Sequence, residues 1–206
     1  MYTATRMASF AGSSRSAVVA GIVMRDMSAC RILQLGDPIL RAVSVPVATP
    51  AEAEGAFRDL RDTLHEFQRT HGFGRGISAV QIGVPKRLIY IELEGRAYCL
   101  RNPEYEWQSE EKFELWDDCF SFPDLMVRLE RSVAVRVRYL DESGGVERIE
   151  ARGAFSELLQ HEIDHLEGIL AVDRALDRES FCTREEYLRR PDFFTEETLR
   201  RGAAKL

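Results

Sequence analysis

Two histidines four residues apart, followed and separated by acids, are the residues of this chain whose types and spacing best fit chemistry. His161, Glu162 and His165 lie in the largely apolar stretch 158–170. On an α-helix, residues four apart share one face, so both imidazoles can bind one metal ion while Glu162 lies beside it. Such histidines also occur as ordinary core or surface residues, but the chain has only four. We therefore predict a hydrolytic metal site here.

The segment that carries the histidines is expected to be helical. Its apolar residues are spaced three, four and one apart, which makes one broad apolar stripe. They are Phe155, Leu158, Leu159, Ile163 and Leu166. Gly168 follows them and is expected to end the helix.

A hydrolytic metal site usually has three protein ligands and leaves one position for water, so a third ligand is needed. No histidine follows His165. Glu185 and Glu186 lie at a plausible distance in a charged stretch. Cys119 is the better candidate, although a lone cysteine is commonly just a small buried apolar residue.

Length and composition predict one globular domain. The chain has 206 residues, 45% hydrophobic and 30% charged, with a net charge of -6. This balance argues against a surface that binds nucleic acid, and the apolar runs are too short to span a membrane. The four cysteines form no C-x-x-C pair, which favours a reducing compartment over a disulfide framework.

The chain is expected to divide into an unstructured extension, residues 1–26, and a single catalytic domain, residues 27–206, with a charged tail from about residue 183. The extension is rich in small residues and has only arginines as charges before Asp26. It could be a transit peptide or a weak signal peptide. We favour a third interpretation, in which Met27 is the natural start.

Further elements follow from local patterns. Thr49 and Pro50 predict a helix start, and the helix is expected to stop near residues 71–72. Strands are expected at 87–94 and 97–100, the second broken by Asn102-Pro103, and a hairpin at 132–139 and 146–152. The glycine-rich stretch 72–83 by itself predicts a tight loop.

Three separated blocks resemble the peptide deformylases. Residues 74–81 (GRGISAVQ) are similar to the family's G-x-G-x-A-A-x-Q, residues 117–121 (DDCFS) resemble E-G-C-L-S, and residues 161–165 (HEIDH) match H-E-x-D-H. Residues 33–41 also resemble the family's start, L-x-x-G-D-P-x-L-R. Order and approximate spacing agree over about residues 30 to 175.

This resemblance implies an α+β fold, with antiparallel β-sheets packed around a central metal-binding helix. It implies removal of the N-formyl group from the N-terminal methionine of newly made chains. Cys119, His161 and His165 would bind one divalent ion, with iron(II) expected and zinc or nickel as replacements. The expected partner is an N-formylated nascent peptide, with the ribosome as a second candidate. The expected location is the cytoplasm, and organellar targeting by residues 1–26 is the alternative.

The resemblance also implies residue roles. Glu162 would take a proton from water and pass it to the leaving amine. The Gln81 side-chain amide and the Phe120 backbone N–H would stabilise the oxyanion. Asp164 is expected to pair with a basic residue, for which Arg131 is the candidate. The residues expected to bind substrate are Gly76, Arg75 and Asp118.

Several positions depart from the family's pattern. They are Arg75, Ser78, Asp117, Asp118 and Met126. Arg75 stands where an aliphatic side chain is usual, and Asp118 replaces a glycine and adds an anion beside Cys119, which would oppose the oxyanion. We expect an altered substrate preference or a reduced rate. Two alternatives stay open: a metallohydrolase for another N-acyl group, and a catalytically silent relative that binds nascent chains.

Overall fold

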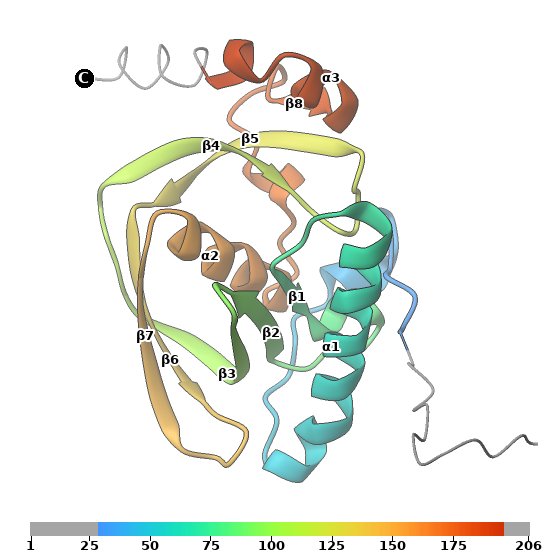
Figure 1. The fold of residues 1–206 in the computed structure, drawn as a ribbon. Coiled ribbons are helices and arrows are strands. Elements are labelled where there is room, and N and C mark those ends of the chain that lie inside the picture. The colour runs from blue at the N-terminus through green and yellow to red at the C-terminus, as the bar shows by residue number, and fades with distance from the viewer. Residues whose placement is uncertain (1–28, 196–206) are drawn as a thin grey trace, which may run out of the picture.

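The computed structural model describes residues 29–195 (Figure 1), and the predictions for residues 1–26 and for the end of the charged tail lie outside this range. The helices are α1 (Pro50–His71), α2 (Ala154–Leu166) and α3 (Arg184–Arg189), with 3-10 turns at Pro38–Arg41, Ala79–Ile82 and Ala171–Arg174. The strands are β1 (Gly76–Ser78), β2 (Leu88–Leu93), β3 (Arg96–Gln108), β4 (Lys112–Asp118), β5 (Leu125–Ser132), β6 (Ala134–Leu140), β7 (Val146–Arg152) and β8 (Phe181–Thr183).

Two antiparallel sheets surround α2. The larger sheet has the order β1-β2-β3-β6-β7, and the smaller has the order β4-β5-β8. The strands curve around α2, which lies in the middle of the fold (Figure 1). This arrangement confirms the expected fold class, antiparallel sheets packed around a central helix.

The central helix is buried along most of its length. Every residue from Ser156 to Leu166 is buried. Its apolar side chains pack against the larger sheet, with Leu159 and Leu166 fully buried. The helix ends at Leu166, two residues before the predicted end. Gly168 lies just beyond, with φ +71°, and a Cβ there would lie 2.5 Å from the Arg41 carbonyl oxygen, so only glycine fits this close approach.

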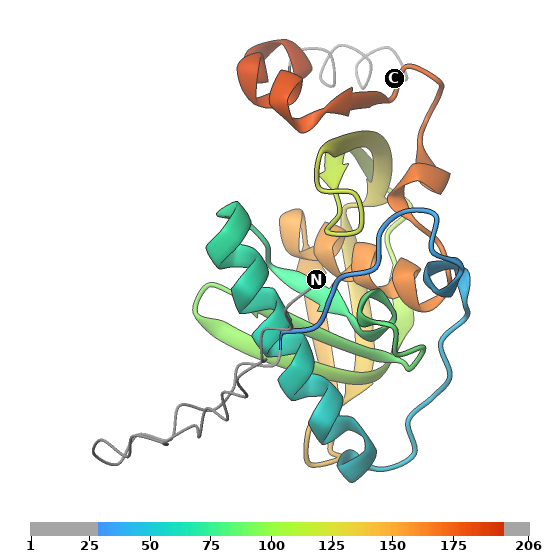
Figure 2. The ribbon, with the colours of Figure 1, turned by 90° about the vertical axis from the view of Figure 1, so that its right-hand side faces the viewer.

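Helix α1 follows its sequence signals. The Thr49 hydroxyl accepts a hydrogen bond from the Glu52 N–H, Pro50 is the first helical residue, and Gly72 ends the helix in the left-handed conformation. Its apolar side, which includes Leu60 and Leu64, packs against β1 and β2 (Figure 2). This helix therefore supports β1, which lies within the glycine-rich segment 72–83.

The predicted β6–β7 hairpin is confirmed, with Ala134 opposite Arg152 and Leu140 opposite Val146. The prediction that β3 stops at Asn102-Pro103 is wrong, because the strand continues to Gln108.

The extension of β3 past Pro103 has a local cause. Asn102 adopts a positive φ of 51°, which asparagine tolerates better than most residues. Its side chain accepts a hydrogen bond from the Val47 N–H at 2.8 Å and donates one to the Val47 carbonyl at 2.9 Å. The register with β6 shifts between Arg101 and Glu104, so the ladder passes the proline. Strands β4 and β5 were not predicted at all.

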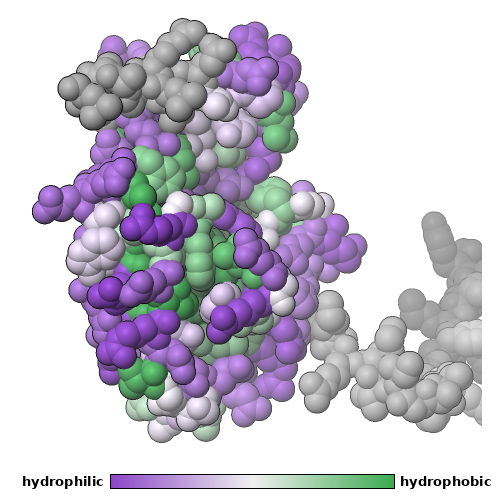
Figure 3. All heavy atoms as spheres, turned by 60° about the vertical axis from the view of Figure 1, so that its left-hand side comes forward, coloured by the Kyte–Doolittle hydropathy of each residue, from purple (hydrophilic) through white to green (hydrophobic). Residues whose placement is uncertain are grey.

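The outer surface in Figure 3 carries mainly hydrophilic side chains, with hydrophobic ones gathered toward the centre of this view. None of the helices within residues 29–195 is long and apolar enough to cross a lipid bilayer.

Truncating the core side of α2 should destabilise the protein. Leu159 is fully buried, so Leu159→Ala is expected to lower the free energy of unfolding by about 2 to 5 kcal/mol. Urea denaturation followed by circular dichroism measures this difference. Leu188→Ala is the control, because Leu188 is 66% exposed and its truncation should change stability by less than about 0.5 kcal/mol. Equal effects of the two variants would contradict the packing described here.

Candidate metal centre and active site

Three side chains that could bind a metal meet at the centre of the fold. Cys119 lies just after β4, and His161 and His165 project from successive turns of α2. Their ligand atoms all lie within 4.8 Å of one another, and the Cys119 Sγ is 3.3 Å from the His165 Nε2. All three side chains are buried.

This donor set fits a small divalent ion. In a tetrahedral site, metal–sulfur bonds of about 2.3 Å and metal–nitrogen bonds of about 2.0 Å put sulfur and nitrogen about 3.5 Å apart. The observed sulfur–nitrogen distance of 3.3 Å is close to that value. Three ligands of this kind leave the fourth position for water, as in catalytic rather than structural sites. Thiolate and imidazole ligands suit iron(II), zinc and nickel.

A network of buried charges orients one of the histidines. The Asp117 carboxylate lies 3.0 Å from the His161 Nδ1 and accepts a hydrogen bond from Arg131 at 3.1 Å. Arg131 also pairs with Asp164, which confirms the predicted partnership, and Arg174 donates to the same Asp164 carboxylate. Burial alone would raise the pKa of Asp117, but the His161 and Arg131 charges hold that pKa well below its usual range. Because the Asp117 carboxylate faces the His161 Nδ1, the Nε2 is the ring nitrogen left to bind a metal.

Glu162 faces the same space as the three ligands. Its Oε2 accepts a hydrogen bond from the Ser78 hydroxyl at 2.6 Å. Burial raises the pKa of Glu162, while the His161 charge and the Ser78 hydrogen bond oppose this rise. A Cβ at Gly76 would lie 2.9 Å from the Glu162 Oε1, so the glycine makes room for the carboxylate. A carboxylate with a raised pKa beside a metal site suits proton transfer.

Gln81 is held with its amide nitrogen toward the cysteine. The Ser78 backbone N–H donates to the Gln81 Oε1 at 2.9 Å, which fixes the orientation of the amide. The Gln81 Nε2 then lies 3.7 Å from the Cys119 Sγ and 3.4 Å from the Ser121 Oγ. A donor fixed next to the metal ligands is placed to stabilise negative charge that develops there.

A pocket of about 410 Å³ opens onto this group. It is lined by all three residues expected to bind substrate and by Phe120, whose ring stacks on Phe67 at 3.8 Å. The lining residues are Phe73, Gly74, Arg75, Gly76, Gln81, Asp118, Cys119, Phe120, Glu157, Leu158, His161, Glu162 and Arg184. His165 lies behind this lining, close to Cys119.

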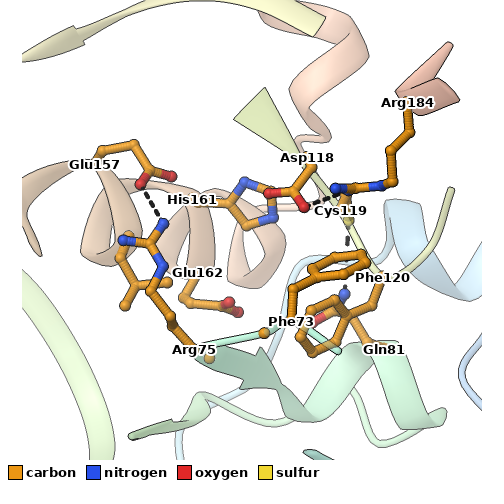
Figure 4. A pocket seen from close by; sticks show the side chains of 13 residues that line it. Phe73, Arg75, Gln81, Asp118, Cys119, Phe120, Glu157, His161, Glu162 and Arg184 are labelled. Atoms are coloured by element: carbon orange, nitrogen blue, oxygen red, sulfur yellow. Dashed lines mark hydrogen bonds and ion pairs between the residues drawn. The ribbon is translucent and has the colours of Figure 1, made fainter. Parts of the chain in front are cut away.

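Ion pairs occupy two opposite sides of the pocket, with His161 between them (Figure 4). On one side, Arg75 donates to the Glu157 carboxylate at 2.8 Å. On the other side, Arg184 at the start of α3 pairs with Asp118, and its guanidinium lies 3.8 Å from the centre of the Phe73 ring. The anion that Asp118 adds beside the cysteine is therefore balanced by an arginine.

Glu157 and Arg184 line the pocket but were not predicted from the sequence. Glu157 could have been found, because it lies four residues before His161 and so on the same helix face. Burial, followed by the Asp117 charge, raises the pKa of Glu157 to about 7, while Arg75 opposes this rise. Arg184 is the first residue of α3, far along the chain from the motifs, so no local pattern marks it.

The alternative ligands lie elsewhere. Glu185 and Glu186 belong to α3, where Glu186 pairs with Arg189 and Arg190. Of the other histidines, His65 pairs with Glu92, and neither His65 nor His71 joins a metal-ligating group within residues 29–195.

Comparison with known proteins agrees with this geometry. Residues 29–181 match the family model described as polypeptide deformylase. The chain belongs to the peptide deformylase family. The family is metal-dependent, in keeping with the Cys119, His161 and His165 group.

Individual deformylases cover most of the chain. The peptide deformylase of Rhizobium meliloti (strain 1021) is 36% identical over 178 residues, which are 84% of this chain and 95% of that protein. The crystal structure of a deformylase from Synechococcus elongatus in complex with actinonin is 31% identical and covers 81% of this chain and 90% of its own, with a TM-score of 0.69. A Met-Ala-Ser-bound deformylase from Acinetobacter baumannii is 29% identical and covers 71% of this chain and 98% of its own, with a TM-score of 0.63.

Removing the carboxylate that supports His161 should weaken metal binding. Asp117→Asn loses the anion that orients the imidazole, and such partners are typically worth about 10- to 100-fold in metal affinity. Competition with a chelator, using Ni²⁺ or Zn²⁺, measures the metal Kd. The neighbouring Asp118→Asn is the matched control, because Asp118 pairs with Arg184 rather than with a histidine. An equal loss in both variants would argue against this role of Asp117.

Proposed function

We propose that this protein is a working peptide deformylase that hydrolyses the N-formyl group from the N-terminal methionine of newly made polypeptides in the cytoplasm. The convergence of Cys119, His161 and His165 beside Glu162, at the base of the pocket, carries this proposal. These three residues would hold one divalent ion, with iron(II) as the expected metal and zinc or nickel as replacements. The ribosome, where formylated chains emerge, is a candidate partner.

The bound ion would supply a Lewis acid that polarises the formyl carbonyl and makes water more acidic. Glu162 would take the proton of the attacking water and return it to the leaving amine. The Gln81 amide nitrogen and the Phe120 backbone N–H would donate hydrogen bonds to the oxyanion that develops on the formyl oxygen. Ser78 would hold both Glu162 and Gln81, since its hydroxyl contacts the first and its backbone N–H the second.

Two observations favour catalysis over a silent, binding-only relative. The Asp118 anion, which would oppose an oxyanion, is paired with Arg184. The pocket also retains a donor and a carboxylate next to the metal-ligating group. A related deformylase binds Met-Ala-Ser, which supports a peptide as the ligand of the corresponding pocket.

The proposal predicts formate release from formyl-Met-Ala-Ser by protein loaded anaerobically with iron(II). Glu162→Ala should abolish turnover, and Gln81→Leu should lower kcat by about 10²- to 10³-fold while leaving metal content unchanged, because an oxyanion donor typically contributes this much. Formate is measured with a coupled dehydrogenase assay, and metal content by elemental analysis. Acetyl-Met-Ala-Ser is the control substrate. Turnover of the acetyl peptide without turnover of any formyl peptide would replace this function with the alternative of a metallohydrolase for another N-acyl group.

The pH dependence of the reaction provides another test. Glu162 acts as a base only when ionised, so activity falls as the pH drops through its pKa, which burial raises above the usual carboxyl value. The Ser78 hydrogen bond lowers this pKa, and Ser78→Ala should therefore move the acidic limb of kcat/KM to higher pH. Ser143→Ala, in the β6–β7 loop, should leave the profile unchanged. A shift to lower pH in Ser78→Ala would contradict the assignment of Glu162 as the base.

A further inference from the structure

An ion pair between Arg75 and Glu157 forms one side of the pocket, next to the buried group of Cys119, His161 and His165. Arg75 donates to the Glu157 carboxylate at 2.8 Å and to the Ala154 carbonyl at 3.3 Å. The Glu157 side chain is only 6% exposed, whereas that of Arg75 is 39% exposed. Both residues line the pocket, and the guanidinium is the more exposed of the two charged groups.

The guanidinium keeps donors for a ligand. An arginine has five N–H donors, and the hydrogen bonds found within residues 29–195 place Arg75 against two acceptors. An apolar side chain that covered this group would displace water from the remaining donors without replacing its hydrogen bonds, which is unfavourable. A side chain that carries a hydrogen-bond acceptor would satisfy one of them. This side of the pocket therefore favours a ligand side chain that carries a hydrogen-bond acceptor.

Glu162 indicates which part of the substrate reaches this side of the pocket. Its carboxylate would return a proton to the leaving amine, so the amine nitrogen must lie close to it. The first side chain branches from the carbon bonded to that nitrogen. A Cβ at Gly76, the residue after Arg75, would lie 2.9 Å from the Glu162 Oε1. Asp118 and Arg184 lie on the side of the pocket opposite Arg75 (Figure 4). The first side chain of the peptide is accordingly expected to point toward Arg75.

The charged residues that line the pocket disfavour a charged side chain on the ligand. A negatively charged side chain would approach Glu157 and Glu162, and a positively charged one would approach Arg75. A neutral acceptor avoids both repulsions. Resting on the function proposed above, we propose that Arg75 and Glu157 make the pocket select a first residue with a neutral hydrogen-bond acceptor in its side chain over an apolar side chain of the same length. Methionine sulfoxide and glutamine are side chains of this class.

Three formyl peptides that differ at one side-chain atom test this selectivity. They are formyl-Xaa-Ala-Ser in which Xaa is norleucine, methionine or methionine sulfoxide, with CH2, S or S=O at the δ position. Chain length stays constant while the acceptor strength rises. For the metal-loaded protein, kcat/KM should be higher for the sulfoxide than for norleucine. In R75L/E157L, which removes both charges and leaves neither one buried alone, the sulfoxide-to-norleucine ratio should fall about tenfold or more.

A matched control and two milder variants separate an effect on selectivity from an effect on folding. Arg136 and Glu150 form a pair of the same residue types across β6 and β7, away from the pocket, and R136L/E150L should keep the wild-type ratio. R75Q/E157Q retains polar groups at both positions and should keep a ratio above one. If R75L/E157L fails to fold or to bind metal, R75M/E157Q replaces it. A fall in the sulfoxide-to-norleucine ratio in that variant supports the proposal, and an unchanged ratio contradicts it.

Binding provides a readout that is separate from turnover. The deformylated peptides Met-Ala-Ser and norleucyl-Ala-Ser, and the corresponding sulfoxide, are titrated calorimetrically into the metal-loaded protein. Their affinities should follow the same order as kcat/KM, so the sulfoxide should have the lowest Kd and the norleucine peptide the highest. Formate release with a norleucine preference, or with a ratio that R75L/E157L leaves unchanged, would overturn the inference and leave the deformylase function standing. No formate from any formyl peptide would instead overturn the function, while the order of the three Kd values still tests the pocket.

Discussion

The pairing of buried charges is the constraint on which the rest of this structure depends. Arg131 on β5 lies between two carboxylates, Asp117 at the end of β4 and Asp164 on α2, and Asp117 in turn contacts His161. Removing one partner of such a network would leave an uncompensated charge in the interior, which is strongly destabilising. The network therefore joins the smaller sheet to the central helix. It also sets the rotation of α2, and so the direction in which both of its histidines point.

A helix that is buried along its length usually has apolar residues all round, but α2 carries histidines, acids and Gln160. The sheets provide partners for several of these polar groups: the Gln160 amide, for example, accepts from the Ser132 N–H and donates to the Ser132 carbonyl. The apolar stripe of α2 packs on the larger sheet, while its polar side faces the smaller sheet and the pocket. One helix thus contributes both to the core and to the chemistry.

The residues that depart from the family's pattern are not isolated changes. Asp118 is paired with Arg184, and Arg75 with Glu157, so each added charge has a partner from another part of the chain. Ser78 replaces an alanine and forms a hydrogen bond to Glu162. The metal-ligating group is left intact beneath a pocket with more charge on its walls. The two ion pairs balance the charges that Asp118 and Arg75 add to the pocket.

Local rules made several features of this protein predictable from its sequence. The four-residue spacing of His161 and His165, the capping of α1 by Thr49 and Gly72, and the alternation of the β6–β7 hairpin depend on residues near one another in the chain, where helix and strand periodicity decide geometry. Cys119 was a candidate because a hydrolytic site needs a third ligand and no histidine follows His165, and the resemblance to the deformylases supported it, but no local rule links this residue to the histidines. The continuation of β3 past Pro103, the partners of Arg75 and Asp118, and the entry of Arg184 into the pocket were decided by the tertiary structure. These ion pairs join residues 82 and 66 positions apart, and no local propensity encodes which distant side chains meet.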